Sequence, residues 1–132
     1  MNITYLGHSS FRIKTANATI ITDPFGKNTG LKFPPSEGEI VTVSHHHESH
    51  DYLDNIKSSE VFLIDGPGEY EIKNIMIKGT RGKSNDGSFD PNIIFQFETE
   101  DITFCHLGDL NRELTKKEIE ELENVDILML PI

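Results

Sequence analysis

Short segments of β-type residues, separated by turn residues, recur along the first hundred residues of the chain. Each is a brief run rich in Ile, Val, Thr or Phe, and Gly, Pro, Asn or Asp lies close to most of them, which is the pattern of strands joined by turns. Ala16-Asn17 predicts one hairpin connection. The expected strands are Ile3–Leu6, Phe11–Lys14, Thr19–Thr22, Ile40–Ser44, Val61–Ile64, Ile75–Lys78, Ile93–Phe97 and Ile102–His106.

One segment near the C-terminal end carries clear helix signals. Thr115-Lys116-Lys117-Glu118 fits a capping box, and Ile119, Leu122 and Val125 form an apolar stripe. The apolar run 125–130 then predicts another strand, so a β-α-β unit closes the chain. Strands followed by this unit indicate a mixed α/β (α+β) class, with a sheet covered by helices on one side. At 132 residues, we expect residues 1–132 to form a single domain.

The remaining segments are polar and favour loops. Lys27–Glu39 contains Gly and two adjacent Pro, and Gly79–Pro91 is polar and Gly-rich. The segment His50–Glu60 could hold one short helix. Glu69 and Tyr70 follow a Gly-Pro-Gly run, and we expect them to belong to a turn.

Composition bounds the class of protein. The formal net charge of −10 opposes nonspecific attraction to nucleic acid or to anionic membranes. No apolar run approaches the length of a membrane span, and the N-terminus lacks the features of a signal peptide. The lone cysteine, Cys105, cannot form an internal disulfide and is expected to be a small buried hydrophobe. We therefore expect a cytoplasmic protein that binds neither nucleic acid nor membrane.

Histidines are concentrated directly after the apolar run 40–43. Four of the six histidines lie at 45, 46, 47 and 50, in the pattern H-x-H-x-x-H. Imidazole is the commonest metal ligand in proteins, and the corner at the end of a strand can aim several rings at one point. The alternative is a polar loop whose imidazoles are only hydrogen-bonded. His46 is expected to face solvent or to lie behind the ligands.

Four separated motifs, in this order, point to a known family: LGHSSF at 6–11, TDPF at 22–25, VSHHHESH at 43–50 and HLGDL at 106–110. With them the chain resembles the metallo-β-lactamase fold superfamily, in particular its small cytoplasmic branch of Zn-dependent hydrolases, which includes ascorbate-phosphate lactonases. DGPGEYE at 65–71 resembles the same branch. The resemblance covers the whole chain but only the N-terminal portion of a family domain.

The resemblance implies an αβ/βα sandwich that carries one or two metal ions, usually zinc, at one edge of the sheets. It implies that His45 and His47 bind the first metal, that His50 binds the second, and that Asp109 bridges both. Asp109 could instead only cap the turn after its strand. Two metals lower the pKa of a shared water and stabilise charge on the attacked group. No residue is identified as the general acid.

Three departures from the family pattern weaken this expectation. Ser49 replaces the Asp of H-x-H-x-D-H, and Ser is a poor zinc ligand. The segment 79–86 contains no His, whereas the family places one there. The last family His belongs to the C-terminal half, which this chain does not reach. His106 lies beside the Gly-Asp pair, and its direction is open, as are the roles of His8 and Asp23 at the site edge or in turns.

Two functions from different classes follow. The first is a metal-dependent hydrolase of an ester, lactone or phosphoester small molecule, with activity weakened or lost. The second is a non-catalytic module of the same fold that binds a ligand or a partner as an oligomer. The apolar strand 125–130 at the end of the chain favours pairing with another copy, so a homodimer is expected.

Overall fold

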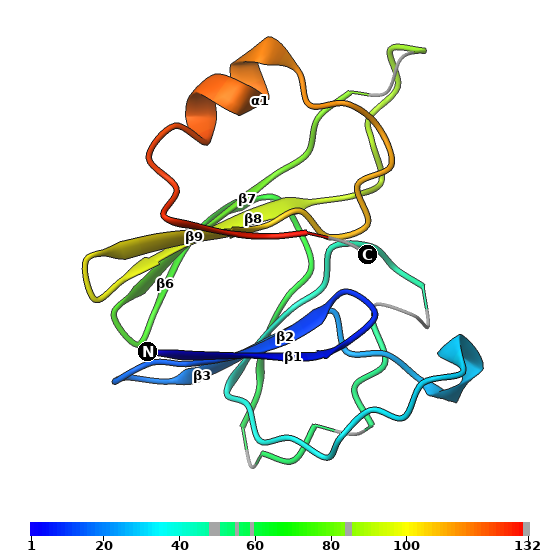
Figure 1. Cartoon of the computed structure of the whole chain (residues 1–132), viewed down its shortest axis with the longest axis vertical. Coiled ribbons are helices and arrows are strands. Elements are labelled where there is room, and N and C mark those ends of the chain that lie inside the picture. Colours follow the sequence, from blue (N-terminus) through cyan, green and yellow to red (C-terminus); the bar gives the residue numbers. More distant parts are fainter. Residues whose placement is uncertain (48–50, 55, 59, 84–85, 131–132) are drawn as a thin grey trace.

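The computed structural model describes the chain except residues 48–50, 55, 59, 84–85 and 131–132. Two five-stranded sheets lie face to face, and the helix α1 (Lys116–Glu121) packs outside the second sheet (Figure 1). This arrangement corresponds to the strand-rich N-terminal portion of an αβ/βα sandwich with one helix near the C-terminal end, as the sequence predicts.

The first sheet contains the N-terminal strands in sequence order, β1-β2-β3-β4-β5. The pairs β1–β2 and β2–β3 are antiparallel, and the expected turn at residues 16–17 joins β2 to β3. The pairs β3–β4 and β4–β5 are parallel. The strands are β1 (Asn2–Gly7), β2 (Ser10–Lys14), β3 (Thr19–Thr22), β4 (Ile40–Thr42) and β5 (Phe62–Ile64).

The second sheet has the order β10-β9-β8-β7-β6. Its first four strands in sequence form an antiparallel meander, and β10 then pairs parallel with β9, which confirms the β-α-β unit. Two hairpin turns, at 73–74 and 100–101, have positive φ at both residues, as two-residue hairpins of type I′ require. The strands are β6 (Gly68–Ile72), β7 (Ile75–Thr80), β8 (Ile94–Thr99), β9 (Ile102–His106) and β10 (Ile127–Met129).

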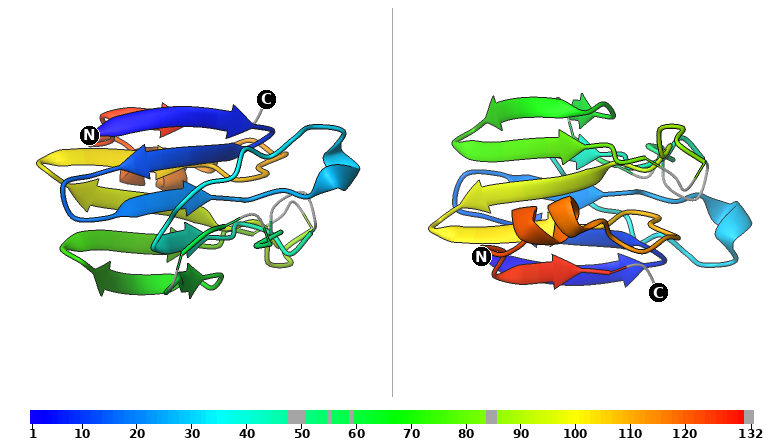
Figure 2. Two further views of the ribbon diagram at one scale, coloured as in Figure 1. Left: turned by 90° about the horizontal axis from the view of Figure 1, so that it is seen from below. Right: turned by 90° about the horizontal axis from the view of Figure 1, so that it is seen from above.

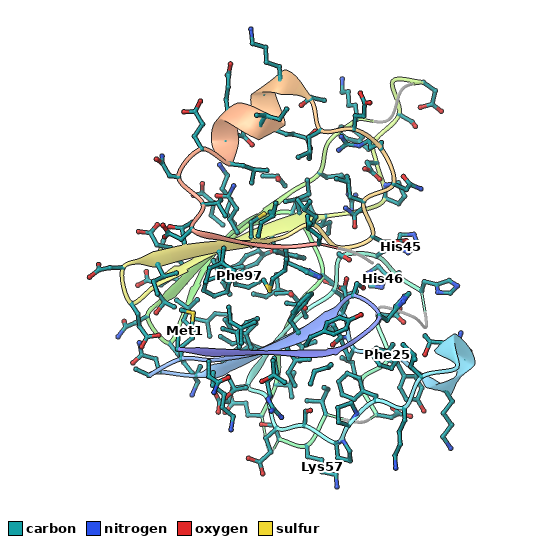
Figure 3. All side chains as sticks on the ribbon, viewed as in Figure 1. Met1, Phe25, His45, His46, Lys57 and Phe97 are labelled. Carbon is teal, nitrogen blue, oxygen red and sulfur yellow. The ribbon has the colours of Figure 1, made fainter. Side chains whose placement is uncertain are left out.

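The main core lies between the two sheets (Figures 1 and 3). Phe97 and Phe104 stack there with ring centroids 4.9 Å apart, and the side chain of Phe97 points from the second sheet toward the first. Burial of apolar area supplies the main driving force for bringing the sheets together. The fully buried members, from both sheets, are Ile13, Ile20, Ile40, Ile75, Phe95, Phe97 and Phe104.

Smaller clusters cover the outer faces of the sheets. Outside the first sheet, Phe25 and Phe33 meet edge to face at 5.0 Å in a loop that contains a short 3-10 helix, η1 (Lys27–Thr29). Outside the second sheet, Leu122 and Val125 pack on a cluster that includes Cys105. Cys105 is fully buried, and burial raises the pKa of its thiol to about 12, so it is the small hydrophobe that was expected.

The capping box at α1 is confirmed, but the helix is shorter than its apolar stripe. Thr115 accepts from the N–H of Glu118, and the Glu118 carboxylate accepts from the N–H of Thr115. The prediction for Ile119 is wrong, since it is 55% exposed. With only six helical residues, the helix rests on Leu122 and Val125 beyond its end.

Two further predictions need correction. Glu69 and Tyr70 lie in β6, not in a turn; the preceding Gly-Pro pair forms the turn, and Tyr70 Oη donates to Gly66 O at 2.9 Å. Between residues 51 and 60, the described residues contain no helix. No helix in the described part of the chain is long and apolar enough to cross a bilayer.

Candidate metal centre

The loops after several strands gather at one edge of the molecule (Figure 2). Within each sheet, the strands that precede these loops run in one direction, as the parallel pairs β3–β4 and β9–β10 show. The backbone N–H of Ile93, just before β8, donates to the carbonyl of Ser44, just after β4, at 2.8 Å. The corresponding ends of the two sheets therefore lie side by side. The loop after β4, with the histidines, meets the loop after β9, with Asp109.

Asp23 anchors the chain immediately before the histidines. Its carboxylate is fully buried and accepts from the N–H of Ser44 at 2.7 Å and from Ser44 Oγ at 2.5 Å. Ser9 Oγ donates to it from 3.5 Å. The backbone of Asp23 has φ 43, a conformation that Asp tolerates better than most residues. Asp23 thus lies at the edge of the candidate site and fixes the loop that starts at Ser44.

His45 and His47 stand next to each other on that loop. Their rings stack with centroids 6.3 Å apart and an interplanar angle of 29°. His45 is half-buried and His47 is exposed. The N–H of His47 donates to the carbonyl of His45 at 3.0 Å, and the N–H of Asp51 donates to the carbonyl of His47 at 2.9 Å. The tight backbone turn is what brings alternate histidines to one side of the loop.

His46 faces solvent, which is one of the two positions that the sequence allows for it. Its side chain is 65% exposed and lies between two carboxylates. Its Nδ1 is 3.5 Å from Asp51 Oδ2, and its Nε2 is 3.4 Å from Asp65 Oδ2. The exposed ring of His46 thus has Asp51 and Asp65 as its neighbours.

Gly108 and Asp109 form the facing turn after β9. Gly108 has φ 68, and a Cβ placed on it would stand 2.5 Å from Asn92 Oδ1 and from Ser44 Oγ. Only glycine allows the turn to approach Ser44 this closely. The N–H of Asp109 donates to Asn92 Oδ1 at 2.8 Å, and the Asp109 side chain is exposed. The turn thus presents a carboxylate at the edge where the histidine loop lies.

His106 points into the interior and not toward solvent. Its side chain is fully buried, its Nε2 lies 2.7 Å from the carbonyl oxygen of Ser9, and the same nitrogen is 4.0 Å from Asp23 Oδ2. Its ring meets Phe11 edge to face at 5.9 Å. His8, half-buried with φ 53, meets Phe25 edge to face at 6.1 Å. His106, at the end of β9 in the second sheet, therefore contacts residues of the first sheet. Its side chain points between the two sheets.

Sequence reasoning missed Ser44 and Asn92, the two residues that connect the loops. Both are buried polar residues beside the candidate ligands. Ser44 has a weak signal, since it precedes the histidine run. Asn92 has none, because its partners Leu107 and Asp109 lie 15 and 17 positions away.

Comparison with known families matches residues 2–132 to the β-lactamase superfamily domain. Among solved structures, a candidate Zn-dependent hydrolase of the metallo-β-lactamase superfamily from Thermotoga maritima superposes with a TM-score of 0.74 and 38% identity. The superposition covers 96% of this chain and 58% of that one. The chain belongs to the metallo-β-lactamase superfamily.

Curated relatives of this superfamily member are described as metal-dependent hydrolases of the UPF0173 group. A Brucella canis relative is 33% identical over 92 residues, which cover 69% of this chain and 38% of the relative. A Bacillus cereus relative is 25% identical over 166 aligned positions, which cover the whole chain and 73% of the relative. The chain thus spans about two fifths of the Brucella protein and under two thirds of the Thermotoga one.

The donor chemistry fits the metal that the superfamily implies, but the described ligand set is incomplete. Imidazoles at 45 and 47 and a carboxylate at 109 are the donor types that zinc binds. Within the described residues, no three His, Cys, Asp or Glu side chains come together in a way that could hold an ion. His50, the fourth predicted ligand, and Ser49 lie outside the described residues. The prediction of His45, His47, His50 and Asp109 as a ligand set remains a prediction.

Proposed function

We propose that this chain is a metal-dependent hydrolase-type protein that acts on an ester, lactone or phosphoester small molecule through metal-activated water. His45, His47, His50 and Asp109 would hold one or two zinc ions. The observation that supports this proposal is the contact of Ser44 with Gly108, which brings the two ligand loops from different sheets to one edge. The description of the relatives as metal-dependent hydrolases supports the same reaction class.

The chain's own residues have a defined part in such a site. A bound zinc ion would supply Lewis acidity and a hydroxide nucleophile near neutral pH. Asp23 fixes the backbone before His45 through two hydrogen bonds to Ser44. Preorganisation of this kind is required because small displacements of ligands reduce catalysis. His50, the fourth proposed ligand, lies outside the described residues.

The test is the metal content of the full chain purified without added metal. Elemental analysis is expected to find about one or two zinc ions per chain. His45→Ala and Asp109→Ala should each lower that content, while His46→Ala, which changes the solvent-facing ring of the same loop, should leave it unchanged. Ser49→Asp, which restores the superfamily carboxylate, should raise it.

Activity is tested separately with p-nitrophenyl esters, a lactone and a phosphodiester, with and without chelator. Hydrolysis that chelator abolishes and zinc restores supports the proposal. Absence of metal in both the natural protein and Ser49→Asp would contradict it.

The second candidate function is a non-catalytic module of the same fold that assembles as an oligomer. It is favoured by β10, which lies at the edge of its sheet: Leu128 in this strand is 45% exposed, and Leu130, just after it, is 49% exposed. Metal content again discriminates, because this function needs none. A location in the cytoplasm, with no nucleic-acid or membrane partner, remains part of the proposal and rests on the single buried cysteine and the acidic charge.

A further inference from the structure

The side-chain amide of Asn92 uses both its donor and its acceptor on the segment that carries Asp109. Its side chain is buried, with 4% exposed. Its Nδ2 donates to the carbonyl of Leu107 at 2.9 Å, and its Oδ1 accepts from the N–H of Asp109 at 2.8 Å. The amide therefore spans Gly108 and binds the residue on either side of it. A turn held on both sides of its glycine has little freedom to re-aim the carboxylate that follows.

The neighbouring residue holds the other ligand loop. The N–H of Ile93 donates to the carbonyl of Ser44 at 2.8 Å, and Ser44 directly precedes His45. The dipeptide 92–93 thus contacts both loops, with its side chain on the Asp109 loop and its backbone on the histidine loop. A shift of this dipeptide would move one loop relative to the other.

A chain of charged groups connects Asn92 to α1. The buried carboxylate of Asp90 accepts from the N–H of Asn92 at 3.0 Å and from Arg112 Nε at 2.8 Å. Arg112 in turn binds both oxygens of Glu118, at 2.8 and 2.9 Å. A bidentate pair of this kind has a fixed geometry as well as a favourable energy. Because Glu118 also belongs to the capping box, the helix end and the start of β8 are held in one network.

We propose that Asn92 is a positioning residue for Asp109, held in place by the series Asp90–Arg112–Glu118. The role toward a metal rests on the proposed function, whereas the hydrogen bond to the Asp109 turn does not. Asn is suited to this position because one carbonyl acceptor and one amide donor face one N–H and one carbonyl. Aspartate has no donor for the Leu107 carbonyl, and alanine has neither group.

The first measurement needs no metal: amide hydrogen exchange of the full chain, read at Asp109 by NMR. Asn92→Ala is expected to speed exchange at Asp109 by about tenfold, since the acceptor of that N–H is lost. Asn92→Asp keeps the shape and the acceptor for the Asp109 N–H but loses the donor to the Leu107 carbonyl. Its effect on exchange at Asp109 should therefore be smaller than that of Asn92→Ala. Asn124→Ala, at an exposed asparagine, is the control and should change neither.

The second measurement is the affinity for zinc alone, by competition with a chelating dye. Residues that orient a ligand from behind typically change metal affinity by about 10–100-fold, and this loss is expected for Asn92→Ala. Arg112→Lys, which keeps the charge but not the fork, should give a smaller loss in the same direction. If Asn92→Ala does not fold, the zinc affinities of Asn92→Asp and Arg112→Lys are measured instead.

The outcomes separate the two proposals. Unchanged exchange at Asp109 in folded Asn92→Ala, which lacks the acceptor, overturns the positioning role. Unchanged zinc affinity in the folded Asn92 variants also overturns it, provided that Asp109→Ala loses affinity. If Asp109→Ala binds zinc like the natural chain, the proposed ligand set fails, and accelerated exchange in Asn92→Ala still supports the role of Asn92 in the turn.

Discussion

Gly108 packs directly on Ser44, so that a Cβ at position 108 would lie 2.5 Å from both the Cβ and the Oγ of Ser44. The two residues follow strands of different sheets, β4 and β9, and each stands next to a candidate ligand, His45 or Asp109. Real Cβ atoms do not approach other atoms this closely, and the contact sets how near the two loops come. The glycine of this Gly-Asp pair therefore has a steric reason in this chain.

Replacing Gly108 by alanine should consequently destabilise the protein strongly. The substitution strains a positive φ and forces the added methyl group into Ser44 and Asn92, for a combined cost of about 3 kcal/mol or more in the free energy of unfolding. Urea unfolding measures it. Gly30→Ala is the matched control, because Gly30 has a similar φ of 78 but nothing within 4 Å of its added Cβ. Equal losses in the two variants would contradict the steric argument.

Asp23→Ala should also be costly, for an electrostatic reason. It leaves the buried N–H and Oγ of Ser44 without their carboxylate acceptor, and a buried donor without a partner costs about 1–3 kcal/mol. Asp23→Asn should cost less, because asparagine keeps an acceptor for the Ser44 N–H and tolerates φ 43. Thermal unfolding of both variants is the measurement. A loss in Asp23→Asn as large as in Asp23→Ala would show that the hydrogen bonds to Ser44 are not the cause.

The Arg112–Glu118 pair predicts a specific acid sensitivity. The hydrogen bonds from Arg112 lower the pKa of Glu118 from 4.5 to about 2 in the folded protein. The folded state therefore binds fewer protons than the unfolded state in this window, and stability rises with pH through it. The contribution is complete above about pH 4.5 and is lost as the pH falls toward 2.

Glu118→Gln should accordingly flatten the dependence of unfolding free energy on pH between about 2 and 4.5. Denaturant unfolding at a series of pH values measures this slope. Glu120→Gln, at an exposed position of the same helix, is the control and should keep the natural slope. If the two variants have the same slope, Glu118 does not carry the acid sensitivity.

The strands and the capped helix could be predicted from sequence because their signals are local. Ile20 and Ile40 lie in apolar runs, and Thr115 with Glu118 forms a short-range motif. β6 was missed because its edge position leaves Glu69 exposed and polar, next to a Gly-Pro turn. The alternation of apolar and polar residues, and the preference of residue types for strands, identify half-buried strands better than polar edge strands.

In the candidate site as well, residues with local sequence signals could be predicted and residues with long-range contacts could not. The candidate ligands could be identified because histidines cluster in sequence and a Gly-Asp pair follows a strand. The buried direction of His106, which points to Ser9, could not be predicted, because the contact spans 97 positions. Asn92 was missed for the same reason. Long-range hydrogen bonds between buried polar residues arise only when the sheets meet, and no local pattern encodes them.

The edge strand β10 leads to the last prediction, that the chain forms a homodimer through it. β10 pairs only with β9 among the described residues, and Leu128 on it is 45% exposed. An edge with open backbone groups and an exposed apolar side chain is suited to pairing with a second copy. Light scattering after gel filtration should give twice the chain mass for the natural protein and the chain mass for Leu128→Lys. Ile119→Lys changes an apolar residue on α1 that is 55% exposed, and this variant should stay dimeric. A monomeric natural protein, or a dimer that Leu128→Lys leaves intact, would rule out this interface.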